Sequence, residues 1–183
     1  MAATTLRQLI DAAGAGDAAA WEAIVDRFSG LVWATTRAHR LSPADASDVA
    51  QTTWLRLVEH LDRIQDPERL GAWLATTARH ESLRLIRLRG RELPTDEADS
   101  FDMPADEPVD RALLTRERDD ALARALRTIG ERCQALLRLL AMPDPPSYEE
   151  IGAALGMPIG AIGPTRARCL DKLRRSPALA GLK

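Results

Sequence analysis

The sequence has few of the residues that build disulfide frameworks, and it has no long apolar runs. Among 183 residues there are two cysteines, Cys133 and Cys169, each within an amphipathic helical pattern and outside any CxxC or Cys/His cluster. We therefore expect both to be small core residues, neither disulfide partners nor metal ligands. No apolar run approaches the roughly 18 residues of a membrane span, and the first residues lack the basic start of a signal peptide. These absences predict a cytoplasmic protein without membrane insertion.

Signatures of catalysis are also missing. His39, His60 and His80 form no HExxH or other metal-ligand spacing, and neither a P-loop nor a Gly-x-Ser-x-Gly motif occurs. Scattered carboxylates do not by themselves make an acid–base pair. The sequence therefore predicts no enzyme activity, no cofactor and no metal.

Runs of alternating apolar and polar residues, the pattern of β-strands, are absent as well. Apolar residues make up 45% of the chain and charged residues 28%, as in an ordinary soluble globular protein. Helical spacing recurs instead, so we expect an all-α fold. The net charge of -2 excludes a uniformly basic nucleic-acid coat, so any affinity for DNA has to come from segregated charge. Lysine occurs only at Lys172 and Lys183, which leaves arginine as the main cation.

An acidic segment divides the chain. Between Glu92 and Asp110 there are eight acidic residues, no basic ones and three prolines. Such a composition buries too little apolar surface to order itself, so the segment is expected to be a flexible linker. We predict two small helical domains, 1–91 and 109–183, joined by the acidic linker 92–108.

Start signals mark the helices of the first domain. Asp17 can cap a helix, and Ser42-Pro43 and Asp66-Pro67 each combine a cap with proline at the first helical position. After Ser29-Gly30 the helical pattern continues from Leu31 to Arg40. The expected helices are Leu6 to Ala13, a stretch that Asp17 caps and that continues to Arg40, Pro43 to about His60, and a longest one from Pro67 to near Gly90.

The last of these helices is basic along one side. From Pro67 to Arg91 there are six arginines against two glutamates, a local charge of +4. A rotation of about 100° per residue puts Trp73, His80, Arg84 and Arg87 on one stripe. A solvated arginine-rich face would explain the charge alone, and a buried indole would explain the tryptophan. An exposed indole that stacks on bases would instead favour single-stranded nucleic acid.

A helix-turn-helix pattern closes the second domain. Ser147 and Glu150 have capping-box spacing, and Gly156 can end the helix in the left-handed conformation. Ile162, Cys169, Leu170 and Leu173 then mark a second helix, with Arg166, Arg168 and Lys172 on other faces. In such motifs the second helix enters the major groove of DNA. A helical hairpin that only packs is the alternative.

The order of these parts resembles the sigma-70 family of bacterial RNA polymerase initiation factors, and within it the compact extracytoplasmic-function (ECF) type. The stretch from Asp45 to Leu55 is similar to the helix that docks on the clamp coiled coil of the polymerase. Trp73 to Arg87 is similar to the helix that reads the minus-ten promoter element, and Asp62 to Gln65 to the loop that traps a flipped base. Tyr148 to Ile162 resembles the minus-thirty-five reader.

The resemblance implies three groups of contact residues. Core polymerase would be bound by Asp45, Asp48, Gln51, Thr52 and Trp54. The minus-ten DNA would be contacted by Asp62, Arg63, Trp73, Arg79, His80, Arg84 and Arg87. The minus-thirty-five DNA would be contacted by Thr165, Arg166, Arg168 and Lys172.

By this resemblance the chain is a promoter-specificity subunit that binds the clamp coiled coil and flap of core RNA polymerase together with promoter DNA. ECF relatives often have an anti-sigma partner. A free-standing helix-turn-helix regulator is the alternative, although it leaves the basic helix unexplained. Gly163-Pro164-Thr165 departs from the family pattern, which predicts a recognition helix that starts late or is kinked.

Overall fold

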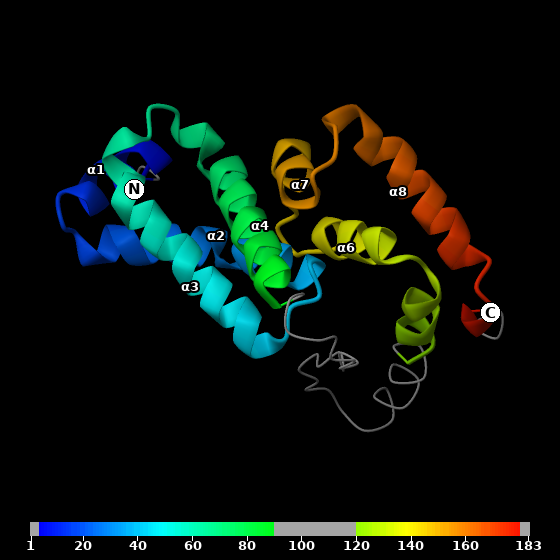
Figure 1. Cartoon of the computed structure of the whole chain (residues 1–183). Coiled ribbons are helices and arrows are strands. Elements are labelled where there is room, and N and C mark those ends of the chain that lie inside the picture. The colour runs from blue at the N-terminus through cyan, green and yellow to red at the C-terminus, as the bar shows by residue number, and fades with distance from the viewer. Residues whose placement is uncertain (1–3, 90–119, 180–183) are drawn as a thin grey trace, which may run out of the picture.

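The computed structural model describes residues 4–89 and 120–179, and within these ranges the chain is all-α, without a strand (Figure 1). The predicted linker 92–108 lies outside the described residues. The first range holds α1 (Leu6–Gly14), α2 (Ala18–Ala38), α3 (Pro43–His60) and α4 (Leu70–Arg89), with short 3-10 turns at Leu61–Arg63 and Pro67–Arg69. The second holds a helix at 120–128, α6 (Glu131–Leu140), α7 (Tyr148–Leu155), α8 (Ile159–Arg174) and a 3-10 turn at Pro177–Leu179.

Side-chain caps start the helices where the sequence predicted them. The carboxylate of Asp17 accepts hydrogen bonds from the first-turn amides of α2, and Ser42 Oγ accepts one from the amide of Asp45 in α3. The predicted continuation of the helix after Ser29-Gly30 is confirmed, because α2 passes through these residues as one helix. Buried side chains on both sides of them, Phe28 and Leu31, keep α2 packed on the core, and this packing outweighs the low helix propensity of Gly30.

The helix-turn-helix has the predicted caps. Ser147 and Glu150 form both hydrogen bonds of a capping box, and Gly156 ends α7 in the left-handed region, with φ of 60°. The helix that follows does not start late. It begins at Ile159 and runs through Pro164, which has no N–H to donate to the carbonyl of Gly160.

One buried cluster joins the two ranges. It contains Ile24 and Leu74 from the first range and Leu136, Ile151 and Ile162 from the second, and each of these side chains is fully buried. In Figure 1, α7 lies directly beside α4, and α8 lies at the opposite edge from α1. The two predicted domains therefore pack against each other in this structure.

Polar contacts surround this shared core. The ring of His39, after the end of α2, lies with its Nε2 3.3 Å from the carbonyl oxygen of Ala154 in α7. Arg69 and Glu149 form an ion pair of 3.3 Å between the start of α4 and α7. Gly71 leaves room for the carboxylate of Glu150, which a Cβ at that position would overlap. Contact between α4 and α7 is therefore close along the first turns of α4.

The prediction that the cysteines are unpaired was wrong. Cys133 in the first turn of α6 and Cys169 in α8 form a disulfide, with Cα atoms 5.3 Å apart. Helical spacing placed both residues correctly on apolar faces. It could not show that the two faces meet, because the residues are 36 positions apart and α7 lies between them in the chain.

Candidate protein and nucleic-acid interface

The predicted basic stripe exists on the surface of α4. His80, Arg84 and Arg87 are exposed, on the side of the helix opposite the buried Ala75 and Ser82. The stripe thus faces solvent while the other side of α4 packs on the core. Its cationic groups are free to approach an extended anion from one direction.

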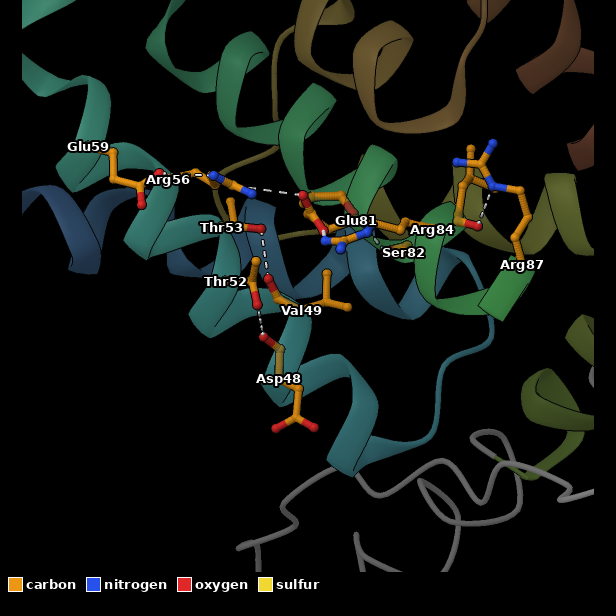
Figure 2. Close-up of polar contacts among 12 residues, drawn as sticks. Asp48, Val49, Thr52, Thr53, Arg56, Glu59, Glu81, Ser82, Arg84 and Arg87 are labelled. Carbon is orange, nitrogen blue, oxygen red and sulfur yellow. Dashed lines mark hydrogen bonds and ion pairs between the residues drawn. The ribbon is translucent and has the colours of Figure 1, made fainter. Parts of the chain in front are cut away.

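A chain of alternating charges connects this stripe to α3 (Figure 2). Arg56 in α3 pairs with Glu59 at 3.0 Å and approaches Glu81 of α4 at 4.0 Å. Glu81 in turn pairs with Arg84 at 3.2 Å. The side chain of Arg84 is 62% exposed although that of Glu81 is 18% exposed, so a phosphate can reach the guanidinium of Arg84 from the solvent side.

Two residues predicted for the same DNA surface are placed differently. Trp73 is half-buried, with its ring centroid 6.0 Å from that of His60. Arg79 is half-buried on the side of α4 that faces α7, and its guanidinium lies against Gly156. In this arrangement Arg79 does not join the stripe formed by His80, Arg84 and Arg87.

The short segment before α4 is anchored from α1. Asp62 and Arg63 are both exposed in the 3-10 turn Leu61–Arg63. Arg7 donates hydrogen bonds to the carbonyl oxygens of Ile64 at 3.1 Å and of Gln65. This contact between segments far apart in the sequence holds the end of the predicted base-binding loop, and no sequence signal had indicated it.

The five predicted polymerase contacts on α3 fall into two groups. Asp48 and Gln51 are exposed, and Thr52 is half-buried, with its hydroxyl donating to the carbonyl oxygen of Asp48 at 2.9 Å (Figure 2). Asp45, in contrast, is 3% exposed. Its carboxylate accepts a hydrogen bond from Ser42, and each of its two oxygens pairs with one guanidinium nitrogen of Arg89. Its carboxylate therefore serves the fold in this structure and does not face a partner.

An apolar groove lies beside Asp48 and Gln51, between α2 and α3. It has a volume of about 820 Å³. Its walls include Trp33, Leu55 and Val58, whose side chains are 43%, 58% and 57% exposed. Trp54, the fifth predicted contact, lines the same groove and packs edge-on against Trp21. Exposed apolar side chains gathered in one hollow are typical of a protein-binding surface.

The sequence reasoning missed Leu55 and Val58. Both stand on the side of α3 away from its buried residues Val49 and Leu57. Apolar residues on the expected polar face were the available signal. A helical rotation of about 100° per residue would have revealed it.

The predicted minus-thirty-five residues lie on α8. Arg166, Arg168 and Lys172 are exposed, and Thr165 is half-buried, with its hydroxyl accepting a hydrogen bond from Arg168 at 3.2 Å. The helix therefore presents three cations to solvent at its middle and second half.

Residues 4–89 and 120–179 contain no group of three or more His, Cys, Asp or Glu side chains arranged to hold a metal ion. None of the helices within these ranges has the length and apolar character to cross a bilayer.

The chain is similar in sequence to known proteins. The ECF RNA polymerase sigma factor SigE of Mycolicibacterium smegmatis is 30% identical over 166 residues, which cover 87% of this chain and 63% of the relative. A family profile described as Sigma-70 region 2 matches residues 24–92, the range that contains the basic stripe and every residue that lines the groove except Trp21. This part of the chain is therefore similar to Sigma-70 region 2, and most of the chain is similar to an ECF sigma factor.

Similarity of fold to a solved structure extends beyond the range that the profile matches. The structure of CnrH in complex with the cytosolic domain of CnrY superposes with a TM-score of 0.57 at 24% identity. The similarity covers 92% of this chain and 94% of CnrH, so it includes helices of both ranges. The chain spans 63% of the length of the mycobacterial relative, less than two thirds.

Proposed function

We propose that this chain is a promoter-specificity subunit of the ECF type, which binds core RNA polymerase and directs the initiation of transcription. The observation that carries the proposal is the exposed groove between α2 and α3 together with the basic stripe on α4, which paired charges link to α3. One small region thus offers an apolar surface for a protein and a cationic surface for nucleic acid. The Sigma-70 region 2 profile covers the stripe and all of the groove except Trp21.

The groove is the proposed docking site for the clamp coiled coil of the polymerase. Trp33, Leu55 and Val58 would supply buried apolar contact, and Asp48 and Gln51 at its edge would supply polar contacts that set orientation. Aromatic side chains in such a hollow are typical of the residues that dominate binding energy. Asp45 is omitted from this surface because Arg89 and Ser42 already engage its carboxylate.

Two surfaces would contact the promoter. His80, Arg84 and Arg87 would hold the minus-ten strand while the segment at Asp62 and Arg63 takes up an unstacked base, an extrusion that costs on the order of a few kcal/mol. On α8, the exposed cations would contact the minus-thirty-five duplex, where base edges give specificity and phosphates give position.

Neither DNA surface carries enough charge for tight binding alone. The polymerase would supply the missing affinity by holding both DNA-contacting regions at a defined spacing, so that the second contact becomes intramolecular. The exposed cations on α4 and α8 number few enough that the free chain is expected to bind promoter DNA weakly.

Co-elution with core polymerase tests the docking surface. Leu55→Ser with Val58→Ser, and separately Asp48→Ala with Gln51→Ala, should each reduce the amount of chain that elutes with core while helical content stays unchanged. Leu88→Ser, which removes a comparably exposed apolar side chain from α4, is the matched control and should bind normally. Undiminished co-elution of both double variants would refute the assignment of the groove.

In vitro transcription with core polymerase tests the DNA surfaces. Arg84→Ala with Arg87→Ala should reduce open-complex formation, and Arg166→Ala with Arg168→Ala should reduce initiation at promoters that depend on the upstream element. Both variants should keep core binding. A palindromic footprint on DNA without polymerase would instead support a free-standing regulator.

A further inference from the structure

The disulfide joins α6 to α8, the second helix of the helix-turn-helix. Cys133 is half-buried in the first turn of α6, and Cys169 is fully buried in α8. The segment between them contains α7 and the turn at Gly156. The bond therefore closes a covalent loop that contains α7, the turn and α8 as far as Cys169.

Few side chains in the second half of α8 are buried. Of the 16 residues in this helix, only Ile162 and Cys169 are buried. Ile162 belongs to the core shared with the rest of the molecule, whereas Leu170 and Leu173 are half-buried. Beyond the helix, Ser176 lies 3.3 Å from the hydroxyl of Thr128. Along the stretch of α8 between Ile162 and the Ser176 contact, the disulfide at Cys169 is the main attachment to α6.

The same stretch of α8 also starts from a weakened point. Pro164 has no N–H for the helix, so one backbone hydrogen bond is missing between the well-packed first turn and the stretch that follows. The exposed cations Arg166, Arg168 and Lys172 lie on either side of Cys169. The relative positions of these cations therefore depend on a part of α8 with few buried apolar side chains.

We propose that Cys133 and Cys169 form a reversible thiol–disulfide switch, which sets how well ordered the second half of α8 is. On the proposed function, this order sets how strongly the chain engages the upstream promoter element. The oxidised state holds the cations in one arrangement, and the dithiol state lets the segment after Pro164 fray. Cys133 is the more exposed sulfur and is therefore the one that a reagent reaches first.

A peroxide is the oxidant class that the switch requires. The thiolate of Cys133 attacks one peroxide oxygen, which breaks the O–O bond, forms a sulfenic acid and releases one water after protonation. Cys169 then attacks the sulfenic sulfur, forms the S–S bond, loses its proton and expels a second water. Two thiols are oxidised by two electrons, and the peroxide is reduced to two waters. A dithiol reverses the change by attack at Cys133, with Cys169 as the leaving thiol.

Thiol counting and amide hydrogen exchange on the full chain test the switch without polymerase or DNA. After hydrogen peroxide, maleimide labelling of the denatured chain should find no free thiol, and after dithiothreitol it should find two. Exchange of amides at 166–174 should be at least about tenfold faster in the reduced chain, since frayed helix ends open readily. Amides in the middle of α3 should exchange equally in both states.

Cys133→Ser with Cys169→Ala is the matched control, and its exchange should equal that of the reduced wild type under both treatments. If this variant fails to fold, the reduced wild-type chain still supplies the comparison. Two free thiols after peroxide, or unchanged exchange at 166–174 with the disulfide formed, would overturn the proposal.

The consequence for DNA is measured separately. With core polymerase bound, the oxidised chain should initiate at least about threefold more often than the reduced chain at a promoter that depends on the upstream element. The cysteine-free variant should not respond to oxidant. Failure to bind core in either redox state would refute the proposed function, whereas the exchange experiment would still decide the switch. Redox-independent initiation by a core-bound chain would overturn the promoter part of the switch.

Discussion

Among the described residues, Asp45 is the only buried side chain that carries a charge. Arg89, in the last turn of α4, reaches it with both guanidinium nitrogens, and Ser42 donates to the same carboxylate at 2.9 Å. The three residues join the start of α3 to the end of α4. This pair therefore fixes the orientation of the helix that carries the basic stripe.

Replacement of Arg89 tests the importance of this pair. Arg89→Gln should lower the free energy of unfolding by about 1–3 kcal/mol, because it leaves a buried acceptor short of its charged partner. Arg87→Gln, on the same turn but without a buried carboxylate partner in the described residues, should change it by less than about 0.5 kcal/mol. Urea unfolding measures both, and equal effects would show that the buried pair adds nothing.

His39 gives the contact between the two ranges a dependence on pH. Burial lowers the pKa of His39 from 6.5, the hydrogen bond to the carbonyl of Ala154 acts in the opposite direction, and the positive charge of Arg79 lowers it further. The folded chain thus favours the neutral ring, whereas the unfolded chain takes up a proton at higher pH. Stability should therefore fall as the pH drops below about 6.5 and continue to fall towards the lowered pKa.

The measurement compares wild type with His39→Gln by urea unfolding at several pH values from 7.5 to 5.5. The variant should lose less stability over this range than the wild type. His80→Gln, an exposed histidine on α4, is the control and should follow the wild type. An identical pH dependence in the wild type and His39→Gln would contradict the role of His39.

At the scale of elements, local signals predicted helix starts and ends better than contacts between helices. Ser42, Ser147 and Gly156 were predicted as caps because their chemistry acts within three or four residues. The start of α4 was less well predicted, because Pro67–Arg69 forms a separate 3-10 turn and the α-helix begins at Leu70. The disulfide and the exposed apolar groove were not predicted, because both depend on how separate helices pack together.

The α4–α7 contact is best tested at a glycine. Gly71→Ala should lower the free energy of unfolding by about 1–2 kcal/mol, because its Cβ would overlap the Glu150 carboxylate and press on Phe28. The cost of this overlap thus exceeds the gain of about 1 kcal/mol in helix propensity that alanine brings over glycine. Gly160→Ala is the matched control, since Gly160 is also second in its helix and has nothing within 4 Å of an added Cβ. It should be neutral or stabilising in the same urea titration, and an equal effect of both changes would argue against close packing.

At the scale of the whole molecule, the shared core predicts a single unfolding transition. All four tryptophans lie in the first range, so their fluorescence reports α2, α3 and α4. Far-ultraviolet circular dichroism reports the helices of both ranges. Because Ile24, Leu74, Leu136 and Ile151 belong to one cluster, both probes should change at the same urea concentration. Two separate midpoints would mean that the halves unfold as independent domains.

The contact of α7 with α4 also has a thermal consequence. Leu74, Ala75, Ala78, Ile151 and Ala154 are fully buried in the shared core, so separation of the two helices would expose apolar surface to water. Such exposure carries a positive heat-capacity change, and the attraction between the helices weakens on cooling. The packed arrangement of α4 and α7 is therefore held more loosely in the cold, where less work is needed to separate the two helices.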